Sequence, residues 1–182
     1  MENTDREILD GLKEEKTRNL AFQTLVKTYQ ERLYWHIRKI VLNHDDADDV
    51  LQNTFVKVWR NLDNFREESG LYTWLYRIAT NESLTFINST KKRSIMPMND
   101  ASEFLLNNMV SDEFFEGDEI QLKLQEAILT LPEKQRIVFN LKYFEEMKYE
   151  AMSEILETSV GALKASFHHA VKKIEEHLKT RD

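Results

Sequence analysis

Residues 149–179 read YEAMSEILETSVGALKASFHHAVKKIEEHLK and predict a short helix, a turn at Glu157-Thr158-Ser159 and a longer helix. Ser159 is a suitable N-cap for the longer helix, because its hydroxyl can accept a hydrogen bond from the first turn. The apolar spacing then directs five residues inward: Leu163, Phe167, Ala170, Val171 and Ile174. The first exposed turns carry Gly161, Ala162, Lys164 and Ala165. A helix-turn-helix presents its second helix to the major groove of DNA in this way, although the same spacing also fits a plain helical hairpin.

The helices expected before this stretch fall into two groups. A C-terminal unit begins near Gln121, where one apolar stripe ends at Pro132 and another runs from Ile137 to Phe144. An N-terminal unit of about four helices precedes it. Three of these helices can be located: residues 20–42, where apolar residues recur on one helical face, residues 47–62, and residues 72 to beyond 88.

The composition agrees with an all-α fold. Among 182 residues only four are Gly and two are Pro, so turns are few and helices are favoured. We therefore expect two small helical domains, over residues 1–93 and 121–182, with a linker over residues 94–120 between them.

The expected linker carries the charge deficit of the chain. Residues 94–122 contain seven Asp and Glu residues and no Lys or Arg; taking these seven from the 32 acids leaves 25, equal to the 25 Lys and Arg. The net charge of −7 is therefore no argument against nucleic-acid binding by the rest of the chain. The linker also holds apolar residues such as Phe104, Leu105 and Phe114. Either they pack on one of the domains, for instance as a short helix, or they become ordered on a partner.

Several classes of protein are excluded or disfavoured. The chain has no Cys, which excludes disulfides and cysteine zinc sites. The charged N-terminus lacks the apolar core of a signal peptide, and no stretch has the roughly 20 apolar residues of a membrane span, so we expect a cytoplasmic protein without membrane insertion. Gly-rich phosphate loops, His-Glu-x-x-His and Gly-x-Ser-x-Gly are absent, and the adjacent His168-His169 lack a carboxylate pattern. We expect no metal, no cofactor and no catalysis.

Aromatic and basic residues interleave from the loop at residues 63–70 onward. The set comprises Phe65, Arg66, Tyr72, Trp74, Tyr76, Arg77, Asn81 and Lys91-Lys92-Arg93. Exposed rings stack on unpaired bases while cations follow the phosphates. The alternative is that Trp74 and Tyr76 belong to the core, which we expect for Trp74, and that Lys91 to Arg93 are merely solvated.

A carboxylate cluster, Asp45-Asp46-Ala47-Asp48-Asp49, precedes Gln52-Asn53. It lacks the glycine and the distal Glu of a calcium loop. The apolar face expected for the helix over residues 47–62 consists of Leu51, Phe55, Val58, Trp59 and Leu62. Asp49, Gln52 and Asn53 share another face. A polar face of this kind is usually only solvated, and a docking surface is the alternative.

Together these three patterns resemble the extracytoplasmic-function (ECF) subfamily of sigma-70-type sigma factors. The N-terminal match runs from Asp45 to Trp59, continues at Phe65-Arg66, and resumes over residues 72–81 as YTWLYRIATN. The C-terminal match begins with LPEKQR at residues 131–136 and continues from Tyr149-Glu150 through VGALK at residues 160–164. The resemblance covers about residues 19–178, apart from the linker.

The resemblance implies roles for the first domain. In the family this domain docks on the clamp helices of the largest subunit of RNA polymerase core, and the matching positions are Asp49, Gln52, Asn53 and Trp59. The domain also melts the −10 promoter element and captures a flipped base in a loop that corresponds to residues 63–71. The positions implied at the −10 element are Asn64, Phe65, Arg66, Tyr72, Arg77, Asn81, Lys91, Lys92 and Arg93.

The resemblance implies that the second domain reads the −35 element. The positions concerned are Ser159, Gly161, Ala162, Lys164, Ala165, His168, His169 and Lys172. Family members commonly carry Ser or Arg where this chain has Ala165, Ser166 and His169, and fewer cations make fewer phosphate contacts. We therefore predict weak intrinsic −35 binding. An anti-sigma factor, which can be membrane-anchored, is a further partner that the family implies.

Two other functions remain open at this point. A stand-alone helix-turn-helix regulator would bind DNA without any polymerase contact. A sigma-like mimic that titrates an anti-sigma factor would keep the docking faces and fail to initiate transcription, although the intact loop with its aromatic residues counts against it.

Overall fold

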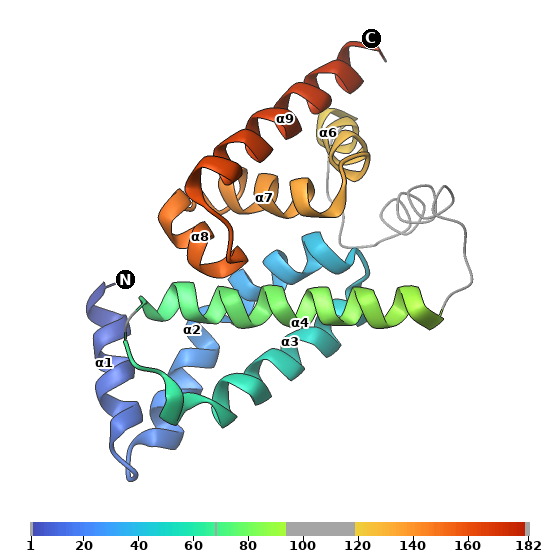
Figure 1. Ribbon diagram of the computed structural model, residues 1–182. Helices are drawn as coiled ribbons and strands as arrows, with labels where there is room; N and C mark the ends of the chain where they lie inside the picture. Colours follow the sequence, from blue (N-terminus) through green and yellow to red (C-terminus); the bar gives the residue numbers. More distant parts are fainter. Residues whose placement is uncertain (1, 68, 94–118, 181–182) are drawn as a thin grey trace. The chain divides into compact units, whose positions relative to one another are not determined.

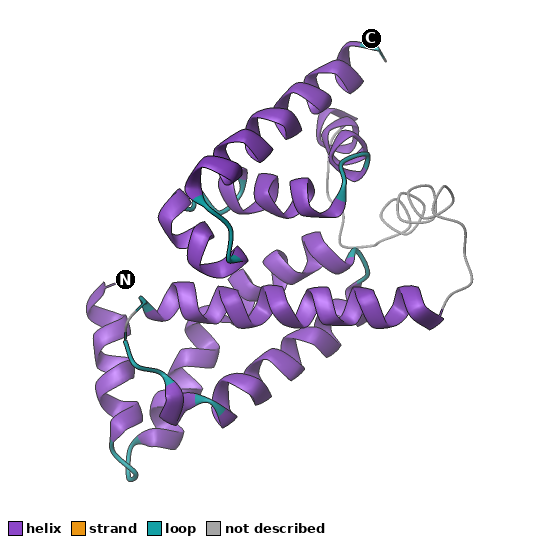
Figure 2. Ribbon diagram, viewed as in Figure 1, coloured by secondary structure: helices purple, strands orange, loops and turns teal. Residues whose placement is uncertain are grey.

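The computed structural model describes residues 2–67, 69–93 and 119–180. All regular structure in these residues is helical, and Figure 2 shows them as helices and loops alone, which confirms the all-α prediction. The chain divides into two compact units, one of residues 1–41 and 45–86 and the other of residues 42–44 and 87–182. Residues 94–118 of the expected linker lie outside the described part of the chain. The two interpretations of their apolar residues, packing on a domain or ordering on a partner, therefore stay predictions. The last two residues of that linker already belong to a helix, α6.

The first unit is built on α1 (Glu2–Lys13), α2 (Arg18–Val41), α3 (His44–Arg60), the short 3-10 helix η1 (Leu62–Asn64) and α4 (Leu71–Arg93) as far as residue 86 (Figure 1). Helices α2, α3 and α4 confirm the three that were located from the sequence, within a few residues. Helix α1 packs on α2. Gly11 allows this close approach, because a Cβ at that position would lie 2.8 Å from the Cβ of Ala21.

The core of the first unit lies between α2 and α4. Its fully buried side chains include Leu25, Leu33 and Ile37 from α2 and Leu75 and Tyr76 from α4. Tyr76 is therefore a core residue, and not a ring exposed for stacking on a base.

A buried polar pair crosses this core. His36 Nε2 of α2 lies 2.8 Å from Thr80 Oγ1 of α4, and the His36 ring rests 4.7 Å from the Tyr76 ring. Burial disfavours the imidazolium, with a smaller contribution from Lys39, and lowers the pKa of His36 to about 3. The imidazole is therefore neutral at physiological pH.

The buried face of α3 differs from the predicted one. Ala47, Val50, Thr54 and Val58 are buried, whereas Leu51, Phe55 and Leu62 are half-buried and Trp59 is 38% exposed. The packed face is thus rotated by about one residue from the face that the largest apolar side chains define. Thr54 can occupy it because its hydroxyl donates a 2.7 Å hydrogen bond to the carbonyl of Val50.

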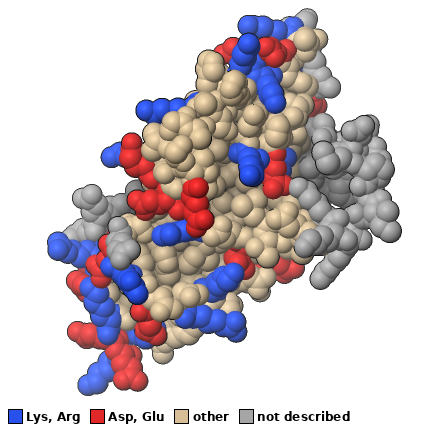
Figure 3. Space-filling model, viewed as in Figure 1, with Lys and Arg blue, Asp and Glu red and all other residues tan. Residues whose placement is uncertain are grey.

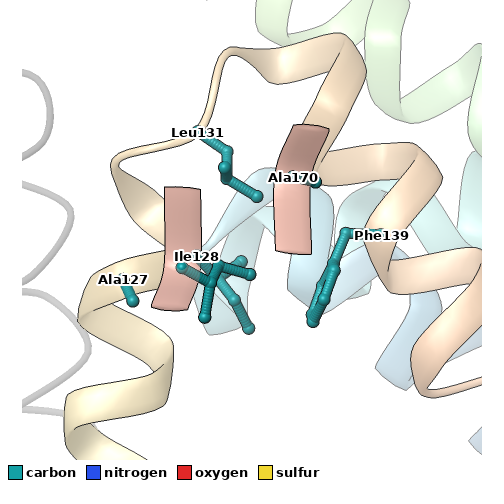
Figure 4. Packing of buried hydrophobic residues seen from close by; sticks show 6 residues of the cluster. Ala127, Ile128, Leu131, Phe139 and Ala170 are labelled. Carbon is teal, nitrogen blue, oxygen red and sulfur yellow. The ribbon is translucent and has the colours of Figure 1, made fainter. Parts of the chain in front are cut away.

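The second unit contains α6 (Glu119–Leu129), α7 (Glu133–Tyr143), α8 (Tyr149–Leu156) and α9 (Val160–Lys179), close to the predicted bounds. Helix α9 packs against α6, α7 and α8. An apolar cluster from α6, the turn after it, α7 and α9 forms the core, and its buried residues, the first five of which Figure 4 labels, are Ala127, Ile128, Leu131, Phe139, Ala170 and Ile174. Phe139 stacks on Phe167 with ring centroids 5.8 Å apart.

The turn between α8 and α9 has the predicted geometry. Glu157 takes a left-handed conformation (φ 50°) that ends α8. Ser159 is the N-cap of α9, and its Oγ accepts a 3.3 Å hydrogen bond from the backbone N–H of Ala162. None of the helices in the described residues is long and apolar enough to cross a membrane.

Candidate functional site

One side of α3 is an exposed polar face with an aromatic end. Asp49, Gln52, Asn53 and Trp59 are all exposed, and Val56, 47% exposed, lies among them. Their spacing of three or four residues places them on one side of the helix. The structure thus brings together all four residues expected to dock on a partner, and it adds Val56, which apolar spacing alone did not single out.

The aromatic end of this face is held from α2. The Trp59 ring lies 4.8 Å from the Phe22 ring, and the guanidinium of Arg18 lies 5.5 Å from the centroid of the Trp59 ring. At the other end of the face, partial burial and the neighbouring Asp49 and Asp45 raise the pKa of Asp46 above its usual value. The face therefore combines a fixed ring with a carboxylate-rich end.

A hollow of about 410 Å³ lies between α3, the loop after it and α4. Its lining residues are Lys57, Asn61, Asn64, Phe65, Arg66, Ser69, Trp74, Arg77, Ile78, Asn81 and Glu82. Five of the residues expected at the −10 element are among them: Asn64, Phe65, Arg66, Arg77 and Asn81. The hollow is therefore built chiefly from the predicted segment, with one wall from α3.

Two aromatic rings line this hollow side by side. The rings of Phe65 and Trp74 lie 4.7 Å apart with an interplanar angle of 39°. Trp74 is half-buried and faces the hollow, so our prediction that it belongs to the core is wrong. The periodicity places Trp74 on the same side of α4 as Arg77 and Asn81, which would have indicated this position.

Polar contacts fix the walls of the hollow. Lys57 of α3 forms an ion pair with Glu82 of α4, and Arg77 Nη2 lies 3.5 Å from Ser69 Oγ of the loop. Among the described residues that line the hollow, Lys57, Arg66 and Arg77 contribute three cations against the single carboxylate of Glu82. An excess of positive charge beside two aromatic rings suits an unpaired nucleotide, because cations attract the phosphates and rings stack on the base.

The structure does not bring every residue expected at the −10 element into the hollow. The ring of Tyr72 instead lies tilted against that of Tyr76, with centroids 4.3 Å apart, and the guanidinium of Arg32 lies 5.1 Å from the centroid of the Tyr72 ring. Helix α4 extends to Arg93, but the side chains of Lys91, Lys92 and Arg93 lie outside the described part. Sequence reasoning missed the contribution of α3, where the i,i+4 pair Lys57 and Asn61 was a usable signal.

The first half of α9 presents an exposed face. All eight residues expected at the −35 element are exposed: Ser159, Gly161, Ala162, Lys164, Ala165, His168, His169 and Lys172. The residues expected to face inward do so, with Leu163, Ala170 and Ile174 buried and Phe167 and Val171 half-buried. This division of the helix into two sides is the geometry that a recognition helix needs.

The cation of Lys164 is positioned by a ring that the sequence did not single out. The Nζ atoms of Lys164 and Lys142 lie 5.7 Å and 5.0 Å from the centroid of the Tyr149 ring. Lys142 Nζ also donates a 3.1 Å hydrogen bond to the carbonyl of Met147. Lys142 and Tyr149 thus extend the candidate surface from α9 to α7 and α8. No cluster of residues that could hold a metal ion occurs in the described part of the chain.

Both units match known protein families. Residues 25–93 match Sigma-70 region 2 and residues 121–174 match Sigma-70, region 4. The chain belongs to the ECF subfamily of the sigma-70 family of RNA polymerase sigma factors, and it therefore acts in promoter-directed initiation of transcription.

Individual relatives agree with this family. The RNA polymerase sigma-H factor of Pseudomonas aeruginosa is 32% identical over 174 residues, which cover 87% of this chain and 86% of the relative. The ECF RNA polymerase sigma factor SigW of Bacillus subtilis is 28% identical, covering 87% and 89% of the two chains. The ECF RNA polymerase sigma-E factor of Haemophilus influenzae is 30% identical, covering 87% of each.

Solved structures share the fold. One shows CnrH in complex with the cytosolic domain of CnrY, with a TM-score of 0.71, 22% identity and coverage of 98% of this chain and 99% of that one. Another is the sigma factor RpoE in complex with the anti-sigma factor NepR from Bartonella quintana, with a TM-score of 0.68, 23% identity and coverage of 87% and 96%.

Proposed function

We propose that this sigma factor engages the promoter with one unit per element. The exposed face of α3 with Asp49, Gln52, Asn53 and Trp59 docks on the clamp helices of the largest polymerase subunit. The hollow beside it takes an unpaired base of the −10 element, and the exposed face of α9 reads the −35 element in the major groove. The proposal includes no catalytic step, and the protein works in the cytoplasm beside the polymerase.

One observation carries most of this proposal. The hollow joins a pair of aromatic rings to three cations, and its volume of about 410 Å³ lies within the range of small-ligand sites. Removing a base from the stack costs a few kcal/mol, and stacking on a ring returns about 1–3 kcal/mol per base. The hollow is thus suited to hold a base that has left the duplex.

An anti-sigma factor is a further proposed partner. The two solved structures that share the fold are described as complexes, CnrH with the cytosolic domain of CnrY and RpoE with the anti-sigma factor NepR. A protein that occupied the exposed face of α3 or α9 would exclude the polymerase or the promoter. Co-purification from the native host, followed by loss of transcription on adding the captured protein, tests this part.

The central test is transcription with reconstituted holoenzyme. Purified protein is added to bacterial core polymerase, and run-off transcripts are scored together with permanganate reactivity of −10 thymines. Phe65→Ala should lower the rate of promoter opening by about 5- to 150-fold, the value of one stacking contact. Phe65→Tyr, which keeps a ring, should restore most of it, and Thr85→Ala, exposed on α4 and outside the hollow, should change nothing.

The same assay separates the alternatives. Core binding without any specific transcript would indicate a mimic that titrates an anti-sigma factor. Promoter binding that is independent of core polymerase would indicate a stand-alone regulator. Undiminished opening with Phe65→Ala would remove the hollow from the proposal and leave the family assignment intact.

A further inference from the structure

Two ion pairs connect the start of the chain to the loop between α3 and α4. Lys13 Nζ, at the end of α1, lies 2.7 Å from Glu67 Oε1, and Arg18 Nη2, at the start of α2, lies 2.8 Å from Asp63 Oδ1. Glu67 raises the pKa of Lys13 above its ordinary value through the hydrogen bond and the charge of its carboxylate. Figure 3 shows basic and acidic side chains interleaved over the region where Figure 1 places α1.

The hairpin formed by α1 and the first turn of α2 is itself well fixed. Ile8 is buried, and Gly11 brings α1 so near α2 that a side chain there would overlap Ala21. The turn between the helices is closed by Thr17, whose hydroxyl donates a 2.8 Å hydrogen bond to the carbonyl of Gly11. Tyr29 Oη donates a 2.6 Å hydrogen bond to Asp5 Oδ1 and so fastens the other end of α1.

The loop that receives the ion pairs has few fixed contacts of its own. Among the described loop residues, backbone hydrogen bonds run from Asn64 to Asn61 and from Phe65 to Leu62, and Gly70 at the end of the loop accepts one from Trp74 of α4. Glu67 has a φ of 57°, a left-handed conformation that a residue with a side chain rarely adopts unless its surroundings hold it there. Arg66 and Ser69, on either side, line the hollow.

We infer that the α1–α2 hairpin positions this loop for the −10 element, with Lys13 and Arg18 as positioning residues that hold Glu67 and Asp63. The hairpin contributes no group to the hollow, so it acts through the loop alone. This inference rests on the proposed function of the hollow. It also assigns a role to α1, which lies outside the residues 25–93 that match Sigma-70 region 2.

Arg18 links the loop to the docking face as well. The guanidinium that binds Asp63 lies 5.5 Å from the centroid of the Trp59 ring at the end of α3. Substitution of Arg18 would therefore disturb both the position of the loop and the face that docks on the polymerase. The pair of Lys13 and Glu67 is the cleaner target, because neither residue lines the hollow or belongs to the docking face.

A charge-swap series on this pair tests the inference. The variants are K13E, E67K and the double variant K13E/E67K, each as full-length protein in holoenzyme with a promoter that the wild type opens. Both single variants should slow promoter opening about two- to five-fold at low salt, since exposed ion pairs contribute little and are screened by salt. The double variant should recover to within about two-fold of wild type, and the affinity for core polymerase should stay constant throughout.

The decisive readout is whether E67K raises or lowers the rate of promoter opening. E67K adds positive charge beside the DNA, so electrostatics alone would speed promoter opening, whereas loss of loop positioning slows it. K16E is the matched control, because Lys16 lies in the same hairpin, is exposed, and has no ion pair with any described residue. It should behave as wild type.

Three results would overturn the inference. The first is faster promoter opening with E67K, and the second is an equal change of opening rate in K13E and K16E. The third is a double variant whose opening rate falls by the product of the two single decreases. K13M gives the same answer if a reversed charge perturbs folding, since it removes the pair without introducing repulsion. A wild-type holoenzyme that opens no promoter at the −10 element refutes the proposed function itself. That result is distinct from the three above, which all require an active wild type.

Discussion

The two units form their proposed DNA-binding surfaces in opposite ways. In the first unit the candidate surface is a hollow whose walls come from three segments, joined by Lys57–Glu82, Arg77–Ser69 and the hairpin ion pairs. In the second unit the candidate surface is one side of α9, whose other side packs on an apolar core. The first surface thus depends on polar contacts between segments distant in sequence, and the second on the burial of a few side chains.

This difference predicts how each surface fails. Polar contacts at an exposed surface contribute little free energy, so changes in the first unit should alter the shape of the hollow while the unit stays folded. The core of the second unit is small, and the loss of one large buried side chain should unfold the whole surface. All three Trp residues, Trp35, Trp59 and Trp74, lie in the first unit, so Trp fluorescence reports on it alone.

The largest effect is expected from Phe139→Ala. Phe139 is 3% exposed and stacks on Phe167 and Tyr143 with centroid distances of 5.8 and 5.1 Å. Its truncation should cost about 3–5 kcal/mol of unfolding free energy in the second unit. Far-UV circular dichroism should show partial loss of helix, while Trp fluorescence and core binding stay unchanged.

Phe139→Leu is the matched control for this variant. It keeps most of the buried volume and should cost clearly less than truncation to Ala. A change of Trp emission that follows the loss of helix in Phe139→Ala would show that the two units unfold together, and the comparison between them would fail.

A smaller effect is expected from pH on the first unit. The pKa of His36 is lowered from 6.5 to about 3, so below pH 6.5 the unfolded chain binds a proton that the folded unit does not. Stability conferred by the neutral His36 is therefore complete above pH 6.5 and declines as the pH falls toward 3. The decline is at most about 1.4 kcal/mol per pH unit, or about 2 kcal/mol between pH 6.5 and 5.

Urea unfolding followed by Trp fluorescence at pH 7 and pH 5 measures this decline. His36→Gln removes the titrating group and keeps a polar partner for Thr80. The variant should be less stable than wild type at pH 7 and show a shallower dependence on pH. Identical pH dependence in the two proteins would mean that His36 is not the group responsible.

The second unit was the more predictable from sequence. The bounds of α8 and α9, the N-cap Ser159 and the two sides of α9 follow from apolar spacing and one capping residue. These features are local, since a helix is defined by residues three and four positions apart. The polar residues of the exposed face of α3, Asp49, Gln52 and Asn53, were predicted for the same reason, whereas apolar spacing placed Trp59 on the buried face.

The hollow was predicted only in part, because it depends on contacts that local spacing does not contain. Lys57 and Glu82 are 25 residues apart, and Lys13 and Glu67 are 54 apart. Trp74 was expected in the core because a large ring usually is buried, whereas the loop leaves it room beside Phe65. Of the four or so helices expected in the N-terminal unit, α1 was not located from the sequence, since it carries few apolar residues and is fixed by Gly11 and by Tyr29.

A modest effect is expected from Ser159→Ala in the second unit. The Ser159 Oγ accepts the N–H of Ala162 at 3.3 Å, a long hydrogen bond at an exposed helix end. Its loss should cost about 0.5–1 kcal/mol of unfolding free energy, the lower part of the range for N-caps. Ser159→Asp should restore the cap, and thermal melting by circular dichroism ranks the three proteins. Equal melting of all three would show that the cap contributes nothing measurable.

The smallest effect is expected from adding a cation to α9. Ala165 is exposed on the face of α9 assigned to the −35 element, beside the proposed DNA contacts Lys164 and Lys172. If an Arg at position 165 contacts one phosphate, the slope of log K against log salt for binding a −35 duplex should steepen by about 0.9. Fluorescence anisotropy with the full-length protein and a labelled duplex, over a salt series, measures the slope.

The position of the new cation decides what this variant means. Thr180→Arg adds the same charge at the far end of α9, outside the assigned face, and should leave the slope nearly unchanged. Equal slopes for A165R and T180R would show that α9 attracts DNA only through its overall charge. A steeper slope for A165R alone would support a defined DNA-facing side on the second unit, formed by a single helix face rather than by a hollow.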